Sequence, residues 1–174
     1  MQHDYTNLIE LFNCTFLDSY NTELILGGDE PVYLPADDGH RQHRIVFARG
    51  YFASALHEIS HWCIAGEERR LMEDYGYWYE PDGRNAKRQA EFEVVEIKPQ
   101  AVEWILSASC GFRFQVSCDN LSGDSDSDWP GFTNKVRNQV IAYLELGMPP
   151  RAQVFSDVLR KYYDVPLLQP ENFQ

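Results

Sequence analysis

The sequence predicts an α+β domain, and two features carry this prediction. Along the chain, a helical pattern is followed by three short strand-like runs, two long helical stretches, another strand-like run and two closing helices. The chain has 174 residues, 44% of them apolar, and no repeat or linker divides it. This length suffices for one hydrophobic core but not for two comfortable domains. We therefore expect one domain over residues 1–174.

The N-terminal half is expected to contain two helices and three strands. Residues 5–20 have the three- and four-residue spacing of an amphipathic helix, on Leu8, Leu11, Phe12 and Thr15. Three runs bounded by glycine, proline or charge read as strands, namely TELILGG, PVYLP and RIVFA. Residues 51–65 return to helical spacing, with Gly66 as the expected stop and an apolar stripe of Phe52, Ala55, Leu56, Ile59 and Cys63.

The C-terminal half is expected to be mostly helical. A long helix over residues 85–106 should bury the stripe Ala90, Val94, Ile97, Ala101 and Trp104 or Ile105. A polar stripe runs beside it, made of Glu93, Glu96, Gln100 and Glu103. The run GFRFQVSCDNL alternates apolar and polar residues like a strand with one wet face. Helices over residues 132–146 and 152–163 close the chain.

Charge and cysteine content limit the class of protein. The net charge of −12 argues against direct binding of nucleic acid and favours a cationic partner or substrate. The N-terminus lacks the pattern of a signal peptide, and no apolar run reaches membrane-spanning length, so we expect a cytoplasmic protein that does not contact a membrane. The cysteines form no C-x-x-C pair and are expected to be buried free thiols: Cys14, Cys63, Cys110 and Cys118.

The sequence H-E-x-x-H occurs once, as His57, Glu58 and His61 inside the helical stretch 51–65. Residues four apart lie on one face of a helix, so both imidazoles can point at one metal ion while Glu58 sits one step round. The apolar stripe of this helix is filled by other residues, which leaves the two histidines unneeded for packing. We interpret His57 and His61 as metal ligands.

The third ligand has to come from elsewhere in the chain. The metzincin pattern would need a glycine and a histidine where this chain has Ile64 and Glu67, so Glu67 is expected to be exposed beside Glu68. The polar stripe of the next long helix offers the alternative of a glutamate ligand. Its candidates are Glu91, Glu93, Glu96 and Glu103, of which we favour Glu96 and then Glu93, with Gln100 and Glu93 as candidates to orient the ligands.

A set of two histidines and one carboxylate is compatible with two chemistries. With zinc it is typical of hydrolases, and with ferrous iron and open positions it is typical of oxygenases. The motif alone does not choose between them.

Four stretches of the sequence resemble the bacterial elongation factor P hydroxylases. They are HRIVFARG, ASALHEISHWCIAGEERR, DYGYWYEPDGRNAKRQAEFEVVEIKPQAVEW and VSCDNLSGD, and the resemblance covers nearly the whole chain. It departs mainly in the loop DDGHRQH and after Asn120. The family's motifs fall on His57, Glu58 and His61, and on residues 92–101 with both Glu93 and Glu96.

The resemblance implies an enzyme that hydroxylates the lysine of translation elongation factor P after a β-lysyl group has been attached to it. It implies a non-heme metal site on a zincin-like helix, which we expect to pack against the second ligand-bearing helix and a small sheet. The metal would be Fe(II), with molecular oxygen as a substrate and no identifiable organic cosubstrate. Glu58 would be a catalytic residue that orients a metal-bound water or a substrate amine. Aromatic residues between the two helices could form a rim for that amine, namely Tyr75, Tyr77, Trp78 and Tyr79.

Two other functions remain open at this stage. One is a small zinc metallopeptidase in which Glu58 is the general base. The other is a binding module with a structural metal, which would need a fourth protein ligand.

Overall fold

The helices and strands follow the order expected from the sequence, with one exception. The structure is a computed structural model, and it describes residues 3–77, 86–117 and 129–174. The elements are α1 (Tyr5–Tyr20), β1 (Thr22–Leu26), β2 (Val32–Leu34), β3 (His43–Phe47), α2 (Phe52–Ile64), α3 (Ala86–Ser109), α4 (Trp129–Leu146) and α5 (Pro150–Tyr163), with short 3-10 turns η1 (Arg69–Leu71), η2 (Glu73–Gly76) and η3 (Pro170–Asn172). They form one α+β domain, as predicted.

The three strands form one small mixed sheet in the order β1-β3-β2. Strand β3 pairs with β1 in parallel and with β2 antiparallel, so that Leu24, Ile45 and Tyr33 lie side by side in register. All three are almost completely buried, and alternate residues along β1 and β3 are more exposed. One face of the sheet therefore contributes to the core.

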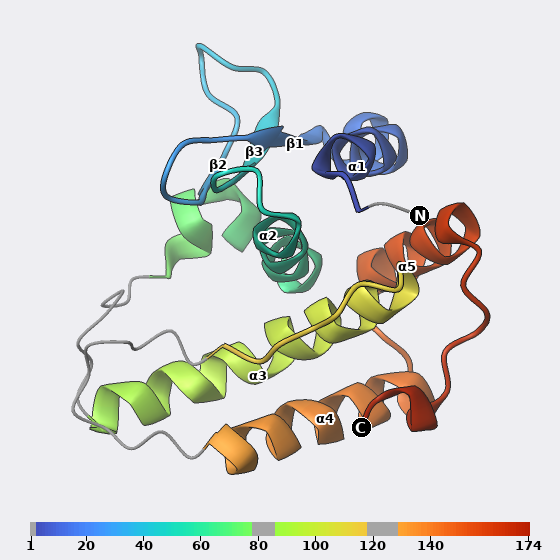
Figure 1. Ribbon diagram of the computed structural model, residues 1–174. Coiled ribbons are helices and arrows are strands. Elements are labelled where there is room, and N and C mark those ends of the chain that lie inside the picture. The colour runs from blue at the N-terminus through green and yellow to red at the C-terminus, as the bar shows by residue number, and fades with distance from the viewer. Residues whose placement is uncertain (1–2, 78–85, 118–128) are drawn as a thin grey trace.

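Helix α2 lies between this sheet and α3, as Figure 1 shows. Its apolar stripe is buried as predicted, and Trp62 joins it in an aromatic cluster with Phe12 and Phe16 of α1 and Phe155 of α5. The end of α2 differs from the expectation for Gly66. The helix ends at Ile64, and the C-cap residue Ala65 has φ −57°, so no left-handed glycine is used.

The turn that leads from β3 into α2 uses the left-handed region of the backbone. Arg49 has φ 54° and Gly50 has φ 69°, a region that glycine adopts without strain. A Cβ on Gly50 would also lie only 3.1 Å from the ring of Tyr5. This turn sets the direction in which α2 begins and hence where its histidines lie.

Helix α3 is buried along a different face from the one predicted in its N-terminal half. Val94 is 70% exposed and Ala90 is also exposed, whereas Ala101 and Ile105 are fully buried. The buried C-terminal half packs against α4 and the C-terminal Phe173, in a cluster with Phe132, Val136 and Val140. The predicted stripe is therefore wrong near residues 90–94 and correct from Ala101 onward.

Residues 111–117 do not form the predicted strand. Their side chains do alternate, with Phe112, Phe114 and Val116 more buried than their neighbours. The segment is extended, but it packs on α3 instead of joining the sheet, with Phe114 stacked on Trp104 at 5.0 Å between ring centroids. The end of the predicted run, from Cys118 onward, lies outside the described residues.

The thiols only partly follow the prediction. Cys63 and Cys110 are buried and free, and burial raises the pKa of each to about 12. Cys14 is free but exposed, because it lies on the outer face of α1, and Cys118 is outside the described residues. Among the described helices, none combines the length and the apolar character needed to cross a membrane.

Candidate metal centre on helices α2 and α3

Helix α2 presents His57 and His61 on the side that faces α3. The stripe on the other side of the helix is filled by Leu56, Ile59 and Cys63, whose burial fixes the rotation of α2 about its axis. Both histidines are half-buried. Since they are four residues apart, their rings meet edge to face, with their centroids 4.7 Å apart and an angle of 67° between the ring planes.

Helix α3 turns a polar stripe toward these histidines. Glu96, Gln100 and Glu103 are 5%, 1% and 8% exposed, although each has a polar side chain. They follow one another at spacings of four and three, so they lie on one helix face. A buried stripe of this kind is unusual unless its groups have polar partners.

Three side chains from the two helices converge. The Nε2 atoms of His57 and His61 lie 3.1 Å apart, and Nε2 of His61 lies 3.3 Å from Oε1 of Glu96. Nε2 of His57 lies 3.8 Å from Oε2 of Glu96. One ligand atom from each residue lies within 4.8 Å of the others, so the three residues could hold a metal ion. Their assignment as ligands stays a prediction.

The neighbouring polar residues contact these three side chains. Glu103 accepts a hydrogen bond of 2.8 Å from Nδ1 of His57. The Gln100 amide lies 3.4 Å from Oε2 of Glu96 and makes two hydrogen bonds with the backbone of Ser117. The expected orienting role of Gln100 fits this contact. Glu93 does not belong to the converging group, and its carboxylate lies 3.5 Å from the amide of Gln89.

The contact between Glu103 and His57 was missed at the level of the sequence. Glu103 was only one of several candidates for the third ligand. The signal that could have found it is the spacing of Glu96, Gln100 and Glu103, which places all three on the face that carries the favoured ligand.

Side chains of α2 and α3 shift one another's pKa values. Burial opposes the charged form of His57, but the carboxylates of Glu103, Glu96 and Glu58 raise its pKa to about 10. Burial would raise the pKa of Glu96, but His61 and His57, with the amide of Gln100, lower it to about 2. Without a metal ion, these pKa shifts favour a protonated His57 beside an ionised Glu96.

Glu58 lies beside the two imidazoles and is half-buried. Burial raises the pKa of its carboxyl group, and the nearby His57 and His61 oppose this rise. A carboxyl group in this setting is suited to take up or release a proton. Glu67 and Glu68 are exposed, as predicted.

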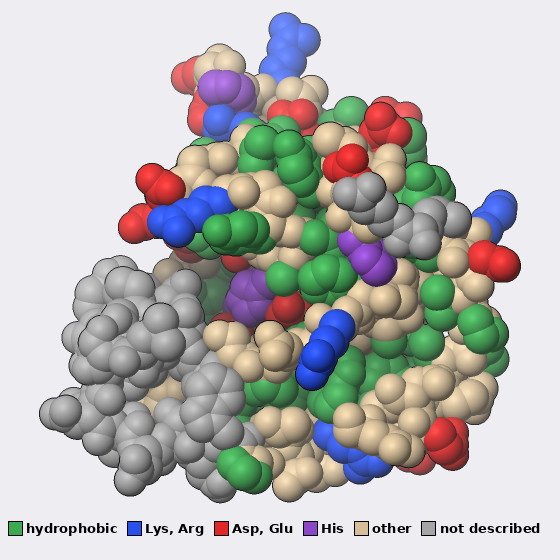
Figure 2. All heavy atoms as spheres, viewed as in Figure 1, with side chains coloured by type: hydrophobic (Ala, Val, Ile, Leu, Met, Phe, Trp, Pro, Cys, Tyr) green, Lys and Arg blue, Asp and Glu red, His purple; other side chains and the backbone are tan. Residues whose placement is uncertain are grey.

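The proposed aromatic rim is only partly described. Tyr75 does not belong to a rim, because it is 4% exposed and its ring stacks on Tyr33 at 4.3 Å between centroids. Tyr77 is 45% exposed and lies under the guanidinium of Arg69. Trp78 and Tyr79 lie outside the described residues. On the face shown in Figure 2, acidic side chains are spread around the surface with basic ones among them.

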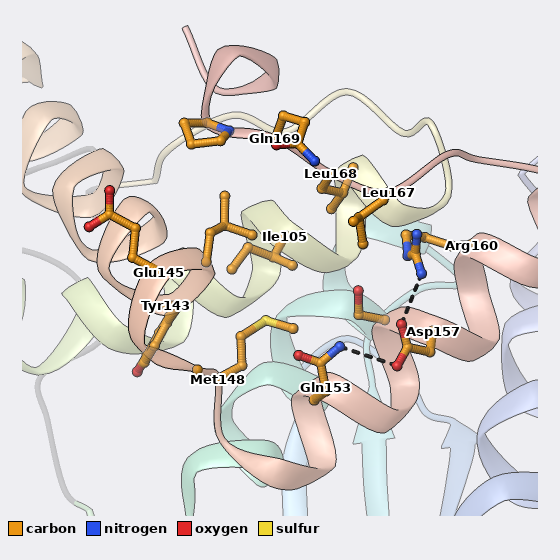
Figure 3. Close-up of a pocket in the computed structure, with 14 residues that line it drawn as sticks. Ile105, Tyr143, Glu145, Met148, Gln153, Asp157, Arg160, Leu167, Leu168 and Gln169 are labelled. Atoms are coloured by element: carbon orange, nitrogen blue, oxygen red, sulfur yellow. Dashed lines mark hydrogen bonds and ion pairs between the residues drawn. The ribbon is translucent and has the colours of Figure 1, made fainter.

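A separate cleft of about 390 Å³ lies between α4, α5 and the C-terminal residues 167–170. Figure 3 shows Met148, Leu168 and Ile105 on its apolar side. On its polar side, Asp157 accepts hydrogen bonds from Gln153 and Arg160, so these groups already have partners. The cleft is lined by none of the three converging residues, His57, His61 and Glu96.

The fold and the site together define a class of protein: a small α+β protein with two histidines and a carboxylate converging from a helix pair. The sequence model of a family described as elongation factor P hydroxylase matches residues 11–173. An elongation factor P lysine hydroxylase of Haemophilus influenzae is 52% identical over 163 residues, which cover 94% of this chain and 91% of that protein. The chain belongs to the elongation factor P hydroxylase family.

Proposed function

We propose that this chain is a metal-dependent enzyme that hydroxylates the β-lysyl-modified lysine of translation elongation factor P. The proposal that the enzyme depends on a metal rests on the convergence of His57, His61 and Glu96 between α2 and α3. Membership of the hydroxylase family and the name of the Haemophilus relative, an elongation factor P lysine hydroxylase, support the substrate.

The donor set fits a divalent metal ion. Two imidazole nitrogens 3.1 Å apart repel each other unless a proton or a cation lies between their lone pairs. A metal ion held by His57, His61 and Glu96 would replace the proton. It would leave open coordination positions, since three candidate ligands converge among the residues that the structure describes.

Ferrous iron suits this ligand set better than zinc for the proposed reaction. Two histidines and one carboxylate are typical of non-heme Fe(II) oxygenases. When bound there, iron would supply the redox chemistry by which molecular oxygen is used to hydroxylate a C–H bond. We expect no organic cosubstrate to be held by the residues named here.

The chain's own residues would bind and orient the substrate. Glu58 would hold the substrate amine, or a water molecule, beside the histidines, because its carboxylate is the nearest acidic group of α2 to the site. A β-lysyl-lysine side chain carries amines, which the acidic protein attracts by charge.

The whole chain, residues 1–174, would act as one hydroxylase domain. Its proposed partner is elongation factor P in the cytoplasm, with no direct contact to nucleic acid or to a membrane. The net charge of −12 is consistent with a cationic side chain as the substrate.

A zinc peptidase with Glu58 as general base is the alternative function for the same residues. Family membership favours the hydroxylase. Cleavage of a peptide library by the zinc-loaded chain, lost in Glu58→Gln, would favour the peptidase instead.

The test uses β-lysylated elongation factor P, Fe(II), a reductant and air. We expect the native chain to add the mass of one oxygen atom to the modified lysine, and Glu96→Ala to add none. An unchanged mass in the presence of iron-loaded native chain, while a cell extract with this activity hydroxylates the same sample, would overturn the proposal.

A further inference from the structure

We propose that Glu103 is a positioning residue that fixes the ring of His57 with Nε2 directed at the metal site. This inference deepens the proposed function and rests on His57 being a ligand. Oε2 of Glu103 lies 2.8 Å from Nδ1 of His57, across the interface between α2 and α3.

The chemistry of the two groups determines which nitrogen carries hydrogen. A carboxylate only accepts hydrogen bonds, so Nδ1 of His57 is the donor in this contact. When the ring is neutral, its lone pair is then on Nε2, the atom that faces Nε2 of His61 and the carboxylate of Glu96. The contact selects the tautomer that a metal ion needs.

The burial of Glu103 supports a role beyond surface charge. Its side chain is 11% exposed, and a carboxylate in such a place is costly unless it has a partner. Within the described part of the chain, the carboxylate of Glu103 has Nδ1 of His57 as its partner. An apolar residue would pack at this position on α3 without that cost.

Helix geometry explains how α3 can both supply the proposed ligand Glu96 and orient the ring of His57 through Glu103. Glu96 and Glu103 are two turns apart on the same face of α3. His57 and His61 are one turn apart on one face of α2. Glu96 therefore reaches the Nε2 side of the histidines while Glu103 reaches the Nδ1 side of His57. Partners of this kind typically change metal affinity by about 10- to 100-fold when they are removed.

Three variants of the full-length chain test the inference by metal affinity. Glu103→Leu removes the acceptor, Glu103→Gln keeps an amide oxygen in its place, and Glu91→Gln removes one exposed charge from the same helix as a matched control. Zn²⁺ affinity is measured by competition with a chelator, without any assay of activity. We expect the Leu variant to bind Zn²⁺ about 10- to 100-fold more weakly, the Gln variant to lose less, and the control to match the native chain.

A spectrum of the native protein provides the readout that a merely structural residue would not affect. In the Zn²⁺-loaded chain labelled with nitrogen-15 at histidine, we expect His57 to carry its hydrogen on Nδ1 and to bind the ion through Nε2. In Glu103→Gln this pattern should be kept. Binding through Nδ1 in the native chain would overturn the inference even if Glu103→Leu does not fold.

The outcomes separate this inference from the proposed function. If Glu103→Leu folds and binds Zn²⁺ as tightly as the native chain, the positioning role is wrong and the metal site stands. If the native chain itself binds neither Zn²⁺ nor Fe(II), the proposed function fails and the inference falls with it.

Discussion

Glu93 and Glu96 are three residues apart on α3, but their surroundings differ. Glu96 is 5% exposed and faces both histidines, whereas Glu93 is only half-buried and its carboxylate lies 3.5 Å from the amide of Gln89. Both match the family motif, so the sequence could only rank them. The rotation of α3 about its axis distinguishes them, and that rotation is set by the burial of Ala101, Val102 and Ile105.

The choice of Glu96 predicts the metal content of single variants. Chain purified without added metal should contain about one ion per molecule, and Glu96→Ala should contain almost none because a two-histidine site holds metal weakly. Glu93→Ala should keep its metal. Elemental analysis of both variants measures this, and metal lost in Glu93→Ala but kept in Glu96→Ala would reverse the assignment.

The raised pKa of His57 predicts that metal binding depends on pH. Because this pKa is about 10 in the metal-free protein, against an ordinary value of 6.5, His57 is protonated at neutral pH and must lose its Nε2 proton to bind an ion. Binding near pH 7 should therefore release about one proton, and affinity should rise about tenfold per pH unit up to about pH 9. Glu96, with a pKa of about 2, adds no proton in this range.

Titration calorimetry in buffers with different ionisation enthalpies counts that proton. The raised pKa of His57 also makes the stability of the metal-free fold depend on pH. The folded-state pKa of His57 lies above its unfolded value of 6.5, so the stabilisation is complete below that pH and is lost as the pH rises toward about 10. Metal binding without proton release would contradict the raised pKa of His57.

At the scale of helices, α2 depends on a residue far away in the sequence. Arg151 of α5 donates hydrogen bonds to the backbone carbonyls of Trp62, Cys63 and Ala65 at the C-terminal end of α2. Its guanidinium also lies 4.6 Å from the centroid of the Trp62 ring. A cation at this end of a helix satisfies free carbonyls and the helix dipole together.

Loss of this contact should destabilise the fold. Arg151→Met keeps the apolar stem but removes the donors, and we expect it to lower the free energy of unfolding by about 2 kcal/mol. Lys161→Ala, on an exposed position of the same helix, should change it by less than about 0.5 kcal/mol. Denaturant unfolding of both variants checks this, and equal stability of the two would show that Arg151 does not hold α2.

Two predictions from the sequence are wrong at this scale, the buried stripe in the first half of α3 and the strand at residues 111–117. Periodicity located α1, the strands, α2, α4 and α5 because each has one apolar face against the core. On α3 the buried face in the first half is polar, so hydrophobicity pointed to Val94 and away from Glu96. Residues 111–117 alternate between more exposed and more buried side chains, as a strand does, but they lie on α3. Alternation shows that a segment has one exposed and one buried face, and it does not show which segment, if any, it pairs with by hydrogen bonds.

At the scale of the whole molecule, the site is made by parts of the chain that are remote in sequence. His57 and Glu103 are 46 residues apart and meet only because α2 is packed between the sheet and α3. The motif and the resemblance could predict the family and the two histidines and glutamate that converge. They could not predict the Glu103 contact, which depends on how the two helices face each other.

The source of the added oxygen tests the proposed hydroxylase most directly. The native chain, loaded with Fe(II) and supplied with reductant, is given β-lysylated elongation factor P under isotopically heavy dioxygen in ordinary water. We predict that the modified lysine gains one heavy oxygen atom, measured by mass spectrometry of the lysine-containing peptide, and that Glu96→Ala gains none. A light oxygen derived from water would contradict a hydroxylation that uses dioxygen. A lysine of unchanged mass beside a cleaved peptide would contradict the hydroxylase and favour a hydrolytic use of the same site.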